Sequence, residues 1–128
     1  MLRAVIAALV LLLAPSPAEA QAYPSRPIRV VIGFAPGTAT DNLMRPLADL
    51  MSADLRQPIV IDNRPGAAGN LGAQLAARAA PDGYTWLYAA TSLAGAMRMY
   101  KNPGFDVFKD FAMVGRIGRS DLVLIASL

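Results

Sequence analysis

The residues best suited to chemistry in this sequence lie in a loop that follows its first apolar run. Gly37, Thr38, Thr40 and Asp41 come shortly after residues 28–34, most of which are Ile, Val or Phe. Backbone N–H groups in such a loop, together with the two hydroxyls, can hold an anion. Asp41 either caps amides at the start of the next helix or meets an ammonium group or a bridging water, and capping is the commoner role.

A second glycine-rich loop, RPGAAGNLGAQ at residues 64–74, follows another short apolar run and opens a helix. It is not a Walker phosphate loop, because no Gly-Lys-Ser/Thr follows, and its three glycines lack the close first pair of a dinucleotide site. Two interpretations remain. Either its amides bind an anion, or Gly66 and Gly69 shape the turn while Gly72 lets the helix pack closely. The spacing alone favours the second.

The composition excludes several kinds of chemistry. The chain has no cysteine and no histidine, which removes disulfides, thiol catalysis, the usual zinc sites and the commonest general base. No spacing indicates a Ser-Lys or carboxylate mechanism, so the sequence predicts no catalytic residue, no metal and no cofactor. The net charge is +3 and the basic residues are scattered singly, which does not indicate nucleic acid as a partner.

Residues 1–20 have the features of a secretory signal peptide. Arg3 gives a positive start, residues 4–14 are unbroken apolar, and Ala18-Glu19-Ala20 is a small-residue cleavage site. We expect export with cleavage after Ala20, or less favourably after Ala22. The alternative is an uncleaved anchor, but the apolar run is too short for a permanent membrane helix, so we expect no stable membrane insertion after cleavage.

The mature chain, residues 21–128, predicts an α/β fold with a parallel sheet. Strands and helices alternate along it, and such alternation produces right-handed crossovers. We expect strands at residues 28–34, 59–61 and 84–90, and helices at residues 41–55 and from residue 70. Both glycine loops then lie at the carboxyl ends of strands, where ligands bind in open α/β sheets.

Within the first helix, Thr40 is the expected N-cap, and Pro46 predicts a kink or a late helix start. Its sheet-facing side chains are expected to be Leu43, Leu47, Leu50, Met51 and Leu55. After residue 92 we expect a short helix at 93–100, a turn at 106–110, and two further strands at 111–117 and 122–126.

Four ordered segments resemble the solute-binding receptors of tripartite tricarboxylate transporters, the Bug family of extracytoplasmic receptors. The segments are YPSRPIRVVIGFAPGTATD, QPIVIDNRPGAAGNLGA, AAPDGYTWLYA and YKNPGFDVFKDFAMVG. The resemblance implies a non-enzymatic periplasmic protein with a two-lobed Venus-flytrap fold, of which residues 21–128 are a truncated, partial N-terminal lobe. It also implies a small carboxylate solute as ligand and the membrane components of a tripartite transporter as partners.

The resemblance places ten residues at the solute. They are Phe34, Pro36, Gly37, Thr38, Asp41, Asn63, Gly66, Ala67, Thr91 and Ser92. Thr38 stands where the family usually has a glycine, which predicts either a strained backbone or a hydroxyl contact in place of an amide contact.

Two other functions remain open from the sequence. The chain is a small exported α/β enzyme that uses its two loops for a phosphorylated substrate, or it is a truncated remnant that binds nothing. The missing histidine and cysteine and the absent phosphate fingerprints argue against the enzyme.

Overall fold

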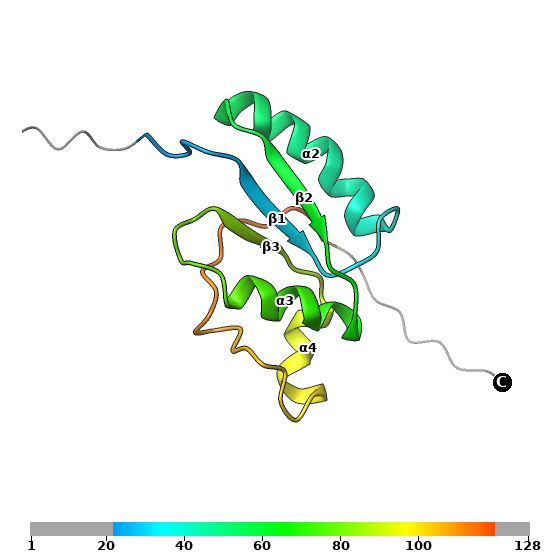
Figure 1. Ribbon diagram of the computed structural model, residues 1–128. Coiled ribbons are helices and arrows are strands. Elements are labelled where there is room, and N and C mark those ends of the chain that lie inside the picture. The colour runs from blue at the N-terminus through cyan, green and yellow to red at the C-terminus, as the bar shows by residue number, and fades with distance from the viewer. Residues whose placement is uncertain (1–21, 120–128) are drawn as a thin grey trace, which may run out of the picture.

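The computed structural model describes residues 22–119 and shows a parallel sheet between two layers of helices (Figure 1). The strands are β1 (Ile28–Ile32), β2 (Ile59–Asn63) and β3 (Thr85–Tyr88), in the order β2-β1-β3. Both neighbours of β1 run parallel to it, with Ile28 opposite Ile59 and Arg29 opposite Thr85. The predicted fold class is therefore confirmed.

The helices follow the strands as expected. They are α2 (Ala39–Leu55), the 3-10 turn η1 (Ala67–Gly69), α3 (Asn70–Ala77) and α4 (Ser92–Met99). Figure 1 shows α2 on one side of the sheet and α3 and α4 on the other. The sheet is thus covered on both faces, as the continuous apolar sequence of β1 predicts.

The start of α2 differs from the prediction. The N-cap is Thr38 instead of Thr40, and its side chain makes no capping hydrogen bond. Its hydroxyl donates to the Ala35 carbonyl at 2.7 Å, so it stabilises the loop before the helix. Pro46 lies inside α2, so the predicted late start is wrong.

The core has one cluster on each face of the sheet. On the α2 side it contains Val30, Ile32, Met44 and Ala48, and on the other side Ala73, Ala96 and Phe105. The prediction that Leu43 and Leu50 face the sheet is wrong, since their exposed fractions are 49% and 69%. Apolar side chains occur on two adjacent faces of α2, so the helical period alone does not select the buried one.

The segment after α4 contains the turn predicted at 106–110, in which Asp110 N–H donates to the Asp106 carbonyl at 2.9 Å. The strand predicted at 111–117 is wrong, because these residues pair with no described strand. Phe111 instead packs edge to face on Phe105, with ring centroids 5.9 Å apart. The predicted signal peptide and the strand at 122–126 lie outside the described residues.

Candidate functional site

The strand order defines a switch point between β1 and β3. The connection from β1 runs to β2 on one side, and the connection from β2 crosses past β1 to reach β3 on the other. In open α/β sheets, ligands bind beyond the carboxyl ends of the strands where successive connections diverge in this way. The loops that follow β1 and β3 are therefore the candidate site.

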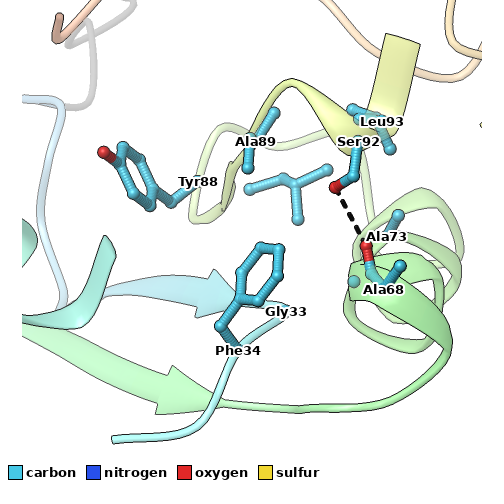
Figure 2. A pocket seen from close by; sticks show the side chains of 11 residues that line it. Gly33, Phe34, Ala68, Ala73, Tyr88, Ala89, Ser92 and Leu93 are labelled. Atoms are coloured by element: carbon cyan, nitrogen blue, oxygen red, sulfur yellow. Dashed lines mark hydrogen bonds between the residues drawn. The ribbon is translucent and has the colours of Figure 1, made fainter. Parts of the chain in front are cut away.

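A small cavity of about 10 Å³ marks this point (Figure 2). It is lined by Gly33, Phe34, Ala68, Gly69, Ala73, Leu87, Tyr88, Ala89, Ala90, Ser92 and Leu93. A cavity of this size holds about one water molecule, so a larger ligand must lie at its mouth. A larger open hollow of about 530 Å³ lies at the opposite end of the sheet, beside Pro58 and Ile59, so size alone does not locate the site.

Asp41 lies in the first turn of α2 and is only 1% exposed. Its carboxylate accepts hydrogen bonds from the Gly37 amide at 2.9 Å, from Arg45 Nε at 2.8 Å and Nη2 at 2.9 Å, and from Asn63 Nδ2 at 3.0 Å. The bond from Arg45, followed by that from Gly37, lowers the pKa of Asp41 to about 2. The capping role is therefore confirmed, and the carboxylate is paired with the Arg45 guanidinium.

Asn63 joins this network to the sheet. Its Nδ2 also donates to the Phe34 carbonyl at 3.0 Å, so the last residue of β2 holds the loop that follows β1. Arg45 Nη2 lies 3.4 Å from Asn63 Oδ1. Arg45 is a residue that sequence reasoning missed, although its place four residues after Asp41 on a helix was a usable signal.

The exposed tip of the first loop is open to solvent. Pro36 and Gly37 are exposed, and a β-carbon on Gly37 would meet nothing within 4 Å, although its φ of +80° favours glycine. Thr38 has a φ of −72°, so the strain considered for this position is absent. Its hydroxyl lies 3.0 Å from the Thr40 hydroxyl.

The second loop lies against the end of β1. A β-carbon built on Gly33 would lie 2.6 Å from Gly69 Cα, and one on Gly72 would lie 2.9 Å from Gly33 Cα. Gly66 and Gly69 have φ values of 143° and 95°. The interpretation that these two glycines shape the turn and Gly72 permits close packing is confirmed. The sequence did not identify Gly33 as a close-packing position, because the glycines that it contacts, Gly69 and Gly72, are distant in sequence.

The start of α4 completes the cavity wall. Ser92 Oγ donates to the Ala68 carbonyl at 2.9 Å, which brings the segment after β3 onto the second loop (Figure 2). Thr91 is the N-cap residue of α4, but its side chain makes no capping hydrogen bond. Tyr100 OH donates to the Ala67 carbonyl at 3.2 Å, a second contact that sequence reasoning missed.

The predicted residues thus fall into two groups. Gly37, Thr38, Asp41 and Asn63 belong to the network around the start of α2, whereas Ala67 and Ser92 lie where the second loop meets α4. Phe34 connects the groups, because its carbonyl accepts from Asn63 and its ring lines the cavity (Figure 2). Pro36 and Gly66 are exposed parts of the two loops.

Within residues 22–119, no group of three or more acidic side chains is placed to hold a metal ion. In the same part of the chain, every helix falls short of the length and apolar character needed to cross a bilayer.

A parallel α/β unit whose loops meet at a switch point is an architecture that commonly binds ligands. Residues 43–128 match the tripartite tricarboxylate transporter family receptor, and the chain belongs to this family. It is 37% identical to protein BugT of Bordetella pertussis over 114 residues, which is 88% of this chain and 35% of that protein. It is 50% identical to a UPF0065 protein of Cupriavidus necator over 82 residues, 64% of this chain and 25% of that protein.

Solved structures agree with this assignment. The periplasmic binding protein BugD is similar at a TM-score of 0.67 and 42% identity, over 70% of this chain and 30% of BugD. A protein of R. palustris solved with adipate is similar at a TM-score of 0.63 and 35% identity, over 66% of this chain and 29% of that protein. The chain spans about a third of the length of the relatives that it matches.

Proposed function

We propose that this chain is part of a periplasmic receptor that captures a small carboxylate solute for a tripartite transporter. Family membership supports a solute-binding role, and a similar protein has been solved with adipate, a dicarboxylate. The transporter's membrane components are the proposed partners, and residues 1–20 are the proposed export signal. No catalytic role is proposed.

The single observation that supports this proposal most strongly is that the loops after β1 and β2 and the segment after β3 meet at the β1/β3 switch point. The amides in the first turn of α2 have no acceptor within the helix, and helix starts favour negative charge. The only acid of the first loop, Asp41, is already paired with Arg45. An anionic solute therefore meets backbone donors without an opposing charge.

The structure suggests different roles for the predicted residues. Phe34, Pro36, Gly37 and Thr38 lie on or beside the open face of the first loop and are proposed to contact the solute. Asp41 and Asn63 use their polar atoms inside the protein, so we propose that they hold this loop in place. Gly66, Ala67 and Thr91 are proposed as contacts from the second loop and the start of α4.

The affinity of these loops by themselves is expected to be low. The site is an open surface around a cavity of one water, so bound carboxylate oxygens would still compete with water for each hydrogen bond. We expect dissociation constants near the millimolar range, about −4 kcal/mol. A receptor that closes a second lobe over the solute would bind more tightly.

Calorimetric titration of the exported chain with adipate, citrate and the neutral analogue adipamide tests the ligand class. The proposal predicts weak saturable binding of the carboxylates and none of adipamide. Equal binding of adipamide would contradict carboxylate recognition. Absence of all binding would support the alternative that the chain is a truncated remnant that binds nothing. Turnover of para-nitrophenyl phosphate that is lost in a Gly37→Val variant would support the enzyme instead.

A further inference from the structure

The second loop contains two successive alanines in a left-handed conformation. Ala67 has a φ of 47° and Ala68 a φ of 54°. Residues with a β-carbon rarely adopt this region, because the β-carbon approaches the following carbonyl oxygen. Two in a row persist only where surrounding contacts hold them.

Two hydroxyls, one at each end of α4, donate hydrogen bonds to the carbonyls of these alanines. Ser92 Oγ donates to the Ala68 carbonyl at 2.9 Å, and Tyr100 OH donates to the Ala67 carbonyl at 3.2 Å. Ser92 is the first residue of α4, and Tyr100 immediately follows its last residue. The turn is therefore held at two points by one short helix, and Figure 2 shows the first of these contacts.

These hydrogen bonds also fix the direction of the loop amides. In a trans peptide the carbonyl and the N–H of the same unit point in opposite directions. Since the Ala67 carbonyl is held by Tyr100, the Ala68 N–H points away from Tyr100. Ala68 and Gly69 also line the cavity at the switch point, so the orientation of their peptide groups shapes the candidate site.

We propose that Ser92 and Tyr100 are positioning residues, which hold the left-handed Ala67–Ala68 turn by its carbonyls and so orient the Ala68 amide offered to a solute. This inference rests on the proposed function, and it gives Ser92 a role different from the direct solute contact expected from the sequence. Both side chains act through the second loop.

The test uses the exported chain with Ser92→Ala, Tyr100→Phe and both substitutions together. Without ligand, the ¹³Cα and ¹³Cβ chemical shifts of Ala67 and Ala68 should lose their left-handed values in the double variant. Exchange of the Gly69 amide, which donates to the Gly66 carbonyl at 3.0 Å, should become faster. The increase should be about ten-fold, and the dissociation constant for adipate should rise by a similar factor.

Tyr84→Phe is the matched control, because it removes a hydroxyl that bonds Ser25 and contacts neither alanine. It should leave the shifts of both alanines unchanged. Left-handed shifts that survive in the double variant, or that are lost equally in the control, would overturn the inference. So would altered alanine shifts with unchanged adipate affinity. If the unmodified chain binds no carboxylate, the proposed function fails, while the alanine shifts still decide whether the hydroxyls hold the turn.

Discussion

Asn63 Nδ2 lies 3.0 Å from Asp41 Oδ1, and this hydrogen bond joins the last residue of β2 to the first turn of α2. The same Nδ2 bonds the Phe34 carbonyl at 3.0 Å. One amide nitrogen therefore connects β2, the loop after β1 and the helix that follows it. Asp41 and Asn63 therefore hold the loop in place from inside the protein, on the side away from its exposed face.

The charge of Asp41 predicts a dependence of stability on pH. Because its pKa is lowered from 3.8 to about 2 in the folded protein, its contribution to folding is complete above the unfolded pKa. That contribution is lost as the pH falls toward 2. We expect the urea midpoint of the unmodified chain to fall between about pH 5 and pH 2.

Asp41→Asn removes this titration, so the variant should be less stable at pH 7 and should lose less stability in the same window. Asp62 also has a lowered pKa in the folded protein, through its bonds to Arg29 and Arg64, which outweigh the opposing effect of burial. The urea midpoint of the variant should therefore still fall with pH in this window, but by less than that of the unmodified chain. If the urea midpoints of the variant and of the unmodified chain changed equally with pH, Asp41 would not be paired with Arg45 as described.

Gly72 should not tolerate alanine, although alanine usually stabilises a helix. A β-carbon there would lie 2.9 Å from Gly33 Cα and 3.2 Å from Gly33 N, which are backbone atoms that cannot move aside cheaply. We expect Gly72→Ala to lower the free energy of unfolding by about 1–3 kcal/mol. Urea denaturation measures this directly.

Gly95→Ala in α4 is the matched control for Gly72. Its β-carbon would meet only the flexible side chain of Met99, with Sδ at 3.3 Å. We expect this variant to be unchanged or more stable by up to about 1 kcal/mol. Equal effects of the two substitutions on the free energy of unfolding would contradict the close contact between Gly72 in α3 and Gly33 after β1.

Residues 23–26 are attached to the segment at the start of β3. Tyr84 OH accepts the Ser25 amide at 2.9 Å, and the Arg26 guanidinium lies 4.1 Å from the centre of the Tyr84 ring. Tyr84→Phe keeps the ring but removes the hydroxyl, so stability should fall by about 1 kcal/mol or less at this exposed site. Proteolysis around residues 22–26 should become faster.

Tyr88→Phe provides the comparison, because no hydrogen bond of the Tyr88 hydroxyl occurs within the described part of the chain. Its digestion at the amino-terminal segment should match that of the unmodified chain. If Tyr84→Phe also left digestion unchanged, the Ser25 contact would not be what fastens the segment.

Export predicts a defined amino terminus. Cleavage after Ala20 gives a chain that begins at Gln21, and the lesser alternative begins at Tyr23. Mass spectrometry of the periplasmic fraction distinguishes these products. Recovery of the chain in the cytoplasm with Met1 intact would contradict the periplasmic proposal.

Much of the fold could be predicted from local sequence. The apolar residues of β1 identified a strand buried on both faces, and the strand predicted at 84–90 corresponds to β3 (Thr85–Tyr88). The alternation of strands and helices in the sequence correctly predicted loops at the carboxyl ends of β1 and β2. These features depend on residues close together in the chain, which is why a sequence pattern predicts them.

The site itself depends on contacts between distant residues, which no local pattern contains. Gly33 and Gly72 meet only because α3 crosses past β1, and Tyr100 reaches Ala67 from the far end of α4. The strand predicted at 111–117 failed for a related reason. An apolar run forms a strand only where a neighbouring strand is available to pair with it.

A carboxylate solute is proposed to bind at the β1/β3 switch point. The most direct measurement is an adipate titration of the ¹⁵N-labelled exported chain, followed by amide chemical shifts. Binding at the switch point should give saturable shifts at residues 37–41, 66–69 and 91–92, with none at residues 23–26 and 82–84 at the opposite end of the sheet. Saturable shifts confined to that opposite end, or no saturable shift at the three switch-point segments, would show that the carboxylate does not bind there.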